Sequence, residues 1–387
     1  MIDATDVRFD AAVRMVDGRV AAIESAVGLT ASERGTVLAP GLVNAHAHLD
    51  LGLAPVRPEE AGFLAWVSAV MEARGGRSPE DVAQGARAAG ARLLATGTTT
   101  VLDIDASGAS RTGLVDSPLR LVSLREVIDG SPGERTERTG VALELARAAV
   151  ESPVSERRAS GLSPHGVHTV SDLLLSDLAP LARGATVAVH WAETPEETRW
   201  MLEGEGPFGN WLGPSPRTSG VERLRRAGML DGTLLVHGNC PAPGELELLA
   251  GRGACVVHCP GSHRYFSRPA FALGEFRAAG VAVALGTDSA ASNEDLDMRR
   301  EVRLARETLG ISGAEAWRMA TEEGARFAPW AHVTGRLGVG DAGDLVRLRP
   351  ADGAALAEQD VDRLFDLLTL EEPAVEGVWV AGERIEG

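Results

Sequence analysis

Lysine is absent from this chain of 387 residues, and all 38 of its basic residues are arginine. A carbamylated lysine, which usually bridges the two metal ions of a dinuclear hydrolase, is therefore excluded. If the chain holds a catalytic metal ion, we expect it to hold one rather than two.

Long apolar runs and paired cysteines are also missing. No stretch approaches the ~20 apolar residues that cross a bilayer, and the N-terminus has neither a basic start nor an apolar signal core. The three cysteines, Cys240, Cys255 and Cys259, form no disulfide framework and lack zinc-knuckle spacing. We therefore expect a cytoplasmic protein with no membrane partner.

The charge balance is acidic, with 55 acidic and 38 basic residues and a net charge of -17. This disfavours nucleic acid as a partner. The 44% hydrophobic and 24% charged residues are ordinary for a globular protein. The length suits one large domain with an accessory one. We expect a small-molecule substrate, and a homodimer stays open.

Short apolar runs alternate with stretches rich in Ala, Leu, Glu and Arg, such as 79–95, 140–149 and 222–227. This alternation predicts strands joined by helices in an α/β fold with a parallel sheet. Eight such units suit a (β/α)8 TIM barrel, which typically needs ~250 residues. A doubly wound open sheet fits less well, because no glycine-rich fingerprint follows the first strand. The predicted strands are 42–45, 98–104, 119–127, 161–163, 186–189, 233–236, 255–257 and 281–285.

The two ends of the chain differ from this pattern. Asp17-Gly18 between two apolar runs predicts a β-hairpin over 13–23. Strands are also predicted at 344–348 and within 377–385. We expect residues 1–40 and 336–387 to form a small composite β-sandwich beside a catalytic barrel of residues 41–335. Glycine and proline in 204–219 predict a loop over the barrel mouth.

Histidines recur where the predicted strands end, the edge that carries the active site in such a barrel. Side chains two apart on a strand face the same side, so His46 and His48 can reach one metal ion. A single histidine at a strand end is more often a hydrogen-bonded structural group than a metal ligand. A structural role explains the whole set poorly, because buried polar groups are costly unless they have partners. The other polar residues at strand ends are His165, His190, His237, His258 and Asp288, with Glu193 one turn beyond His190.

This set resembles the amidohydrolase superfamily, in particular its branch of mononuclear aminohydrolases that act on purines and related rings. The resemblance covers nearly the whole chain. It implies that His46, His48, His190 and Asp288 bind one divalent metal ion, Zn²⁺ or alternatively Fe²⁺, with an open position for water. The motifs that carry it are PGLVNAHAH at 40–48, SPH at 163–165, HWAE at 190–193, VHG at 236–238, HCP at 258–260 and GTDSAASN at 286–293.

The resemblance also implies a mechanism. The metal would lower the pKa of its water towards ~7, so that hydroxide attacks the ring. Asp288 would accept the proton of the water, and Glu193 would carry a proton to a ring nitrogen and then to the departing amine. His237 would orient the water or polarise the developing oxyanion. The reaction would hydrolyse a carbon–nitrogen bond outside peptides and release ammonia.

Two loops depart from the family pattern. The chain reads SPHGVHT at 163–169 where SPHAPYT is frequent, and GSH at 261–263 where Arg-Ser-Asn is common. Both loops border the expected substrate pocket, so the roles of His168 and His263 stay open. Core packing and a solvated charge are alternatives for Trp66 and Glu72. The candidate substrate-binding residues are His165, Trp66, Glu72, Arg74 and Arg125.

The loops look most like those of aminodeoxyfutalosine deaminases, which act in menaquinone biosynthesis. Deaminases of adenosine derivatives, such as S-adenosylhomocysteine and methylthioadenosine, come a close second. The favoured function is therefore hydrolytic deamination of a 6-aminopurine nucleoside. The alternative is an amidohydrolase acting on another ring, namely a guanine or cytosine analogue, a cyclic amide or a triazine. A non-catalytic binding protein is a remote alternative.

Overall fold

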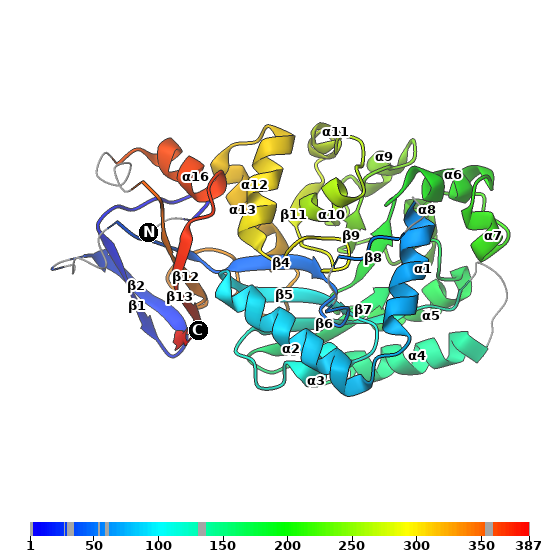
Figure 1. Ribbon diagram of the computed structural model, residues 1–387, viewed down its shortest axis with the longest axis horizontal. Helices are drawn as coiled ribbons and strands as arrows, with labels where there is room; N and C mark the ends of the chain where they lie inside the picture. The colour runs from blue at the N-terminus through cyan, green and yellow to red at the C-terminus, as the bar shows by residue number, and fades with distance from the viewer. Residues whose placement is uncertain are drawn as a thin grey trace.

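Two four-stranded parallel sheets form the centre of the computed structural model, which describes residues 3–26, 28, 35–52, 55–58, 62–130, 137–352 and 359–386 (Figure 1). The order is β4-β5-β6-β7 in one sheet and β8-β9-β10-β11 in the other, so each strand pairs with the next along the chain. All eight predicted parallel strands are confirmed. Their bounds are β4 Leu42–Ala47, β5 Thr98–Asp105, β6 Arg120–Val127, β7 Arg158–Pro164, β8 Ala188–Trp191, β9 Leu234–His237, β10 Cys255–His258 and β11 Ala282–Leu285.

Isolated parallel bridges join the outer edges of the two sheets. Leu162 in β7 pairs with Val187 just before β8, and Ala47 in β4 pairs with Asp288 just after β11. The amide of Leu162 donates to the carbonyl of Thr186 at 2.9 Å. Each edge of one sheet therefore lies beside an edge of the other.

Side chains of the parallel strands alternate between two buried clusters, because successive residues of a strand face opposite sides. The inner cluster draws on every one of the eight described parallel strands, with members such as Val43, Leu102, Val122, Ala159, Ala188, Leu234, Val257 and Ala284. The helix-facing cluster joins the other strand faces to the surrounding helices, with members such as Leu121, Val127, Val189, Leu93, Leu174 and Leu224.

Helices surround the parallel strands (Figure 1). The Ser78 hydroxyl accepts from the Asp81 amide in a capping box, and Pro79 occupies the first turn, so α2 begins where the sequence predicts. The helices are α1 Phe63–Arg74, α2 Pro79–Ala95, α3 Ala109–Gly113, α4 Glu137–Val150, α5 Asp172–Ala182, α6 Pro195–Glu203, α7 Phe208–Leu212, α8 Gly220–Ala227, α9 Glu245–Leu249, α10 Pro260–Tyr265, α11 Leu273–Ala278, α12 Met298–Leu309, α13 Gly313–Met319, α14 Glu322–Ala325 and α16 Val361–Thr369.

One local prediction was wrong in part. Segment 204–219 was expected as a loop, but it contains the short helix α7. Phe208 and Leu212 are both buried and lie four residues apart, on one face of that helix. Their burial favours a helical turn despite the flanking glycines.

The ends of the chain form two antiparallel sheets at one end of the long axis, opposite α6, α7 and α8 (Figure 1). The predicted hairpin is confirmed, and positive φ angles at Asp17 and Gly18 suit its tight turn. The strands predicted at 344–348 and within 377–385 are also confirmed. The two sheets are β1-β2 and β14-β13-β12-β3, with bounds β1 Ala11–Val16, β2 Arg19–Ser25, β3 Val37–Pro40, β12 Leu345–Arg349, β13 Ala374–Val380 and β14 Glu383–Ile385.

Among the residues that the structure describes, no helix combines the length and apolar composition needed to cross a membrane.

Candidate metal and substrate site

A bulge in β4 positions the first two histidines. The pairing of β4 with β5 shifts between Asn44 and Ala47, so that three steps along β4 match two along β5. Such a bulge turns nearby side chains away from the regular alternation of a strand. His46 lies at this irregularity and His48 just beyond it, and their ring centroids are 4.9 Å apart.

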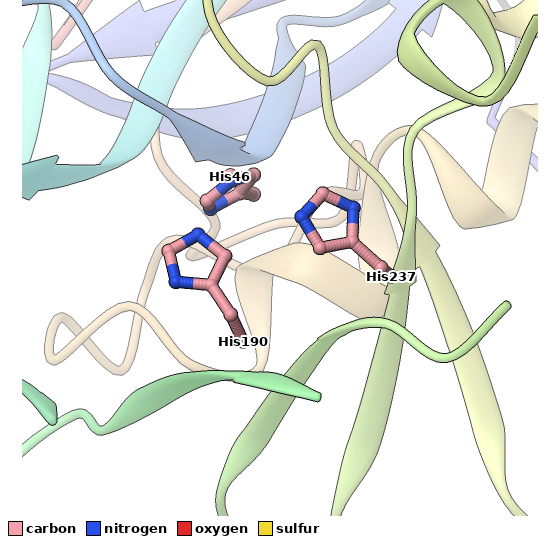
Figure 2. A group of neighbouring side chains, drawn as sticks. All are labelled: His46, His190 and His237. Carbon is pink, nitrogen blue, oxygen red and sulfur yellow. The ribbon is translucent and has the colours of Figure 1, made fainter. Parts of the chain in front are cut away.

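Histidines from the ends of two other strands, β8 and β9, converge on these two. Figure 2 shows the imidazoles of His46, His190 and His237 turned toward one another. Potential ligand atoms of these three residues all lie within 4.8 Å of one another. The Nε2 atoms of His48 and His190 are 3.3 Å apart, with rings only 8° from parallel. The structure therefore brings together all the histidines expected to hold or assist a metal.

Asp288 completes the cluster from the loop after β11. Its Oδ1 atom lies 3.6 Å from His46 Nε2 and 3.8 Å from His48 Nε2. Its Oδ2 atom accepts hydrogen bonds from the hydroxyls of Ser262, at 2.7 Å, and Ser292, at 2.9 Å. Burial alone would raise the pKa of Asp288, but the adjacent imidazoles outweigh burial and hold it well below its usual value. An ionised oxygen therefore faces the histidines.

The donor set fits a divalent metal ion. Both ring nitrogens of His46 are buried without a hydrogen-bond partner among the described residues. His190 Nδ1–H donates to the carbonyl of His165 at 2.5 Å, which leaves its Nε2 lone pair facing His48. Burial holds the pKa of both His48 and His190 well below the usual value, so both rings are neutral. A cation between the Nε2 atoms of His48 and His190 would accept a lone pair from each ring, and nitrogen with carboxylate ligands suits Zn²⁺ or Fe²⁺.

Glu193 lies beside this cluster, with Oε2 3.6 Å from His237 Nε2. Burial, reinforced by the nearby Asp288, raises the pKa of Glu193 well above its usual value. Burial lowers the pKa of His237 to about 3. Burial thus favours the protonated carboxyl of Glu193 and the neutral imidazole of His237.

Backbone strain accompanies these residues. Ala192, His237 and Asp288 adopt positive φ angles of 51°, 77° and 60°. Each such conformation costs ~1–3 kcal/mol for a residue other than glycine and is concentrated at functional sites. The buried Glu197 stabilises the first of them, because its carboxylate accepts from the amides of Ala192 and Glu193 at 3.0 and 2.9 Å.

His165 lies between the histidine cluster and a second acidic group. Its ring centroid is 5.0 Å from that of His190, and its Nε2 atom is 3.9 Å from Glu126 Oε1. Burial lowers the pKa of His165 to about 3. Burial and the neighbouring Asp50 raise the pKa of Glu126 to about 7. Glu126 is a residue that the sequence prediction missed.

The other predicted substrate-binding residues occupy different surroundings. Trp66 donates from Nε1 to the carbonyl of Ala291, in the loop that carries Asp288, at 3.3 Å. Arg74 forms an ion pair of 3.3 Å with the buried Asp50. Glu72 is exposed on α1.

Arg125 is not brought to the histidine cluster. It lies on the same face of β6 as Leu121 and Val127, which belong to the helix-facing cluster. Glu126 lies on the other face, which Val122 and Leu124 share as members of the inner cluster. The alternation of side chains along the predicted strand places Glu126 on the same face as Val122 and Leu124, and this could have identified it from the sequence.

The two histidines left open have defined contacts. His168 is buried, with Nδ1 3.5 Å from Glu197 Oε1. His263 lies between two oxygens, Asn239 Oδ1 at 3.0 Å and the carbonyl of Pro269 at 2.7 Å. His258 stacks on Phe271 with ring centroids 4.0 Å apart and stays outside the histidine cluster.

Comparison with known proteins shows the family to which this chain belongs. The model of the amidohydrolase family matches residues 37–385. The 5-methylthioadenosine/S-adenosylhomocysteine deaminase of Halobacterium salinarum is 31% identical over 82% of this chain and 74% of its own length. The protein of the same name from Thermococcus kodakarensis is 29% identical over 79% of this chain and 72% of its own length.

Solved structures share the fold. A zinc-bound adenosine deaminase from Xanthomonas campestris has a TM-score of 0.79 at 26% identity, over 97% of this chain and 88% of that one. Helicobacter pylori aminofutalosine deaminase, in complex with methylthio-coformycin, has a TM-score of 0.81 at 22% identity, over 97% and 95%. The family match spans both sheets and the cluster of histidines, and the chain belongs to the amidohydrolase family of hydrolases.

Proposed function

We propose that this protein is a metal-dependent deaminase of 6-aminopurine nucleosides. The observation that carries the proposal is the position of Glu193, a buried carboxyl group with a raised pKa, 3.6 Å from His237, whose ring lies in one cluster with His46 and His190. The relatives named 5-methylthioadenosine/S-adenosylhomocysteine deaminase support the same reaction.

One divalent ion, Zn²⁺ or alternatively Fe²⁺, would be held by His46, His48, His190 and Asp288. When bound, it supplies Lewis acidity, which makes water a stronger nucleophile near neutral pH. The absence of lysine leaves no carbamylated bridge for a second ion. The zinc in the adenosine deaminase structure supports the choice of Zn²⁺.

Three side chains would move or hold protons. Asp288 Oδ1 accepts from the Ser289 amide at 2.7 Å and faces the histidines, and this carboxylate would accept the proton of the water. Burial favours the protonated form of Glu193, which would give its proton to a ring nitrogen of the substrate and then carry a proton of the attacking water to the leaving amine. His237, neutral and 3.6 Å from Glu193, would hydrogen-bond the attacking water or the developing oxyanion.

The substrate proposal retains two members of one class. Aminodeoxyfutalosine was favoured by loop resemblance, and the link to menaquinone biosynthesis depends on it. Adenosine derivatives are supported by the names of the curated relatives, which share up to 31% identity with this chain. Both candidate substrates carry a 6-aminopurine ring, which would face Glu193.

We also propose that the two parallel sheets close into one eight-stranded barrel of residues 41–335. Two observations support this closure. Isolated bridges join the sheets at both edges, and all eight described parallel strands contribute side chains to one inner cluster. Residues 1–40 and 336–387 would form the accessory β-sandwich. The bridge between Arg19 and Ala342 supports that association.

Ammonia release tests the function. Metal-loaded protein is incubated with aminodeoxyfutalosine, S-adenosylhomocysteine, 5-methylthioadenosine and adenosine, with guanine and cytosine as other rings. We expect release from at least one purine nucleoside and a loss of about a hundredfold or more in kcat for Glu193→Gln. The exposed Glu196→Gln is the matched control and should keep the wild-type rate. Ammonia from no nucleoside, or full activity in Glu193→Gln, would overturn the proposal.

A further inference from the structure

We propose that Arg268 binds a carboxylate group of the substrate, at a subsite beside the candidate metal site. This inference rests on the proposed deaminase function and specifies the part of the substrate that lies away from the purine ring. It assigns substrate recognition to a residue that the sequence prediction did not include.

Arg268 lies two residues beyond Phe266, the residue that follows α10. The Cζ atom of Arg268 is 4.9 Å from the ring centroid of Phe266 and 5.6 Å from that of Phe63 in α1. These two rings pack against Trp66, at centroid distances of 5.1 and 5.9 Å. The guanidinium therefore lies against the aromatic group formed by Phe63, Trp66 and Phe266, which we call the aromatic wall.

One edge of this guanidinium has no acceptor among the described residues. The Nε and Nη2 atoms of Arg268 are buried and have no hydrogen-bond partner among the residues that the structure describes. These two atoms form the same side of the planar group, where two parallel N–H bonds match the two oxygens of one carboxylate. A buried donor without an acceptor is unfavourable, so this edge is suited to an anion that arrives with the ligand.

The aromatic wall borders the catalytic residues. The hydrogen bond from Trp66 Nε1 to the carbonyl of Ala291 attaches the wall to the loop of Asp288. The positive charge of Arg268 acts to lower the pKa of both Glu193 and His237. Arg268 is therefore within electrostatic range of the proton-transferring groups.

The two arginines predicted to bind substrate are less suited to this role. Arg74 already pairs with Asp50 at 3.3 Å. Arg125 also has a buried Nε atom without a partner among the described residues, but it lies on the helix-facing side of β6. Arg268 thus has a two-donor edge that no described residue occupies, and it lies near the candidate metal site. We infer a nucleoside whose side chain carries a carboxylate next to an apolar or aromatic group.

A comparison of two nucleosides tests this selectivity. S-adenosylhomocysteine carries a carboxylate, whereas 5-methylthioadenosine does not. We expect Arg268→Gln to lower the ratio of kcat/KM for the first over the second by about tenfold or more, because a charged bidentate pair is lost. Arg268→Lys should restore only part of the ratio, because an ammonium lacks the two-donor edge. The exposed Arg264→Gln removes the same charge from α10 and should keep the wild-type ratio.

Binding of a simple anion separates this inference from the deaminase proposal. Benzoate and its neutral isostere benzamide are titrated calorimetrically into metal-loaded wild type, Arg268→Gln, Arg268→Lys and Arg264→Gln, each checked for an unchanged melting temperature. We expect wild type and Arg264→Gln to bind benzoate about tenfold or more tighter than Arg268→Gln. Failure to deaminate any of the four nucleosides named above would refute the deaminase proposal and leave this binding comparison intact. Equal benzoate binding by wild type and Arg268→Gln, or no binding by either, would overturn the role of Arg268.

Discussion

Asp288 Oδ2 accepts a hydrogen bond from Ser292 Oγ at 2.9 Å, although the two residues lie on opposite sides of a turn after β11. Ser292 is not itself one of the proposed metal ligands. Its contact, together with that of Ser262, fixes the plane of the carboxylate and directs Oδ1 to the histidines. The orientation of Asp288, a candidate metal ligand, therefore depends on its hydrogen bonds with Ser262 and Ser292.

Ser292→Ala is predicted to weaken metal binding. Removing one of the two hydroxyls leaves Oδ2 held by Ser262 alone, and loss of such an outer partner lowers metal affinity by about ten- to a hundredfold. A chelator competition at fixed pH measures the affinity. Ser68→Ala, on the exposed face of α1, is the control and should match wild type. Equal affinities for Ser292→Ala and wild type would refute the role of this contact.

Glu126 should make stability depend on pH. Burial raises its pKa in the folded protein from 4.5 to about 7. Between these values the folded state binds the proton more tightly than the unfolded chain does, so the free energy of unfolding falls as the pH rises through this window. Across this window the titration of Glu126 lowers the free energy of unfolding by at most about 3 kcal/mol.

Glu126→Gln removes this titration. Compared with wild type, the variant should gain stability progressively between pH 5 and pH 8, as measured by urea unfolding at several pH values. The exposed Glu144→Gln should follow the wild-type curve. Parallel curves for wild type and Glu126→Gln would show that Glu126 titrates normally.

Much of the fold follows from local sequence. The eight parallel strands are apolar runs bounded by polar residues, and the terminal hairpin has a tight turn at Asp17-Gly18. The convergence of His46, His48, His190 and Asp288 was also expected, because such residues at strand ends share one edge of a parallel sheet. The roles assigned to them, the domain division and the oligomeric state stay predictions.

Other parts of the site depend on how the chain turns and on which side chains pack together. Glu197 accepts from the Ala192 and Glu193 amides only because the chain turns back on itself after β8. The position of Arg268, whose Nε and Nη2 atoms have no partner among the described residues, depends on the rings of Phe63 and Phe266 that pack against it. Neither property has a sequence pattern, since both side chains resemble ordinary surface charges when the sequence is read alone.

Gly166 and His168 form a coupled pair in the loop that departs from the family pattern. A Cβ atom at Gly166 would lie 2.9 Å from Cε1 of the buried His168 ring. Gly166→Ala should therefore cost about 1–3 kcal/mol of stability through overpacking. In a His168→Ala background the same change should cost clearly less. Urea unfolding of the four proteins measures this coupling, and additive effects would contradict it.

Arg120 joins the parallel strands to the terminal sheet. Its fully buried guanidinium makes a bidentate pair with Asp344, at 2.6 and 3.1 Å. Arg120→Met should destabilise the protein by about 3–5 kcal/mol, because Asp344 keeps a buried charge without its partner. Adding Asp344→Asn should recover part of the loss. A melting temperature of Arg120→Met equal to that of wild type would refute this coupling.

The amount of metal bound per chain tests the central claim most directly. Protein purified without chelator is analysed by mass spectrometry of its metals, alongside His190→Ala, Asp288→Ala and the control His332→Ala, which lies near Glu156. We predict about one zinc or iron ion per chain in wild type and the control, and far less in the other two variants. Two ions per chain, or none after reconstitution, would contradict the single-metal account.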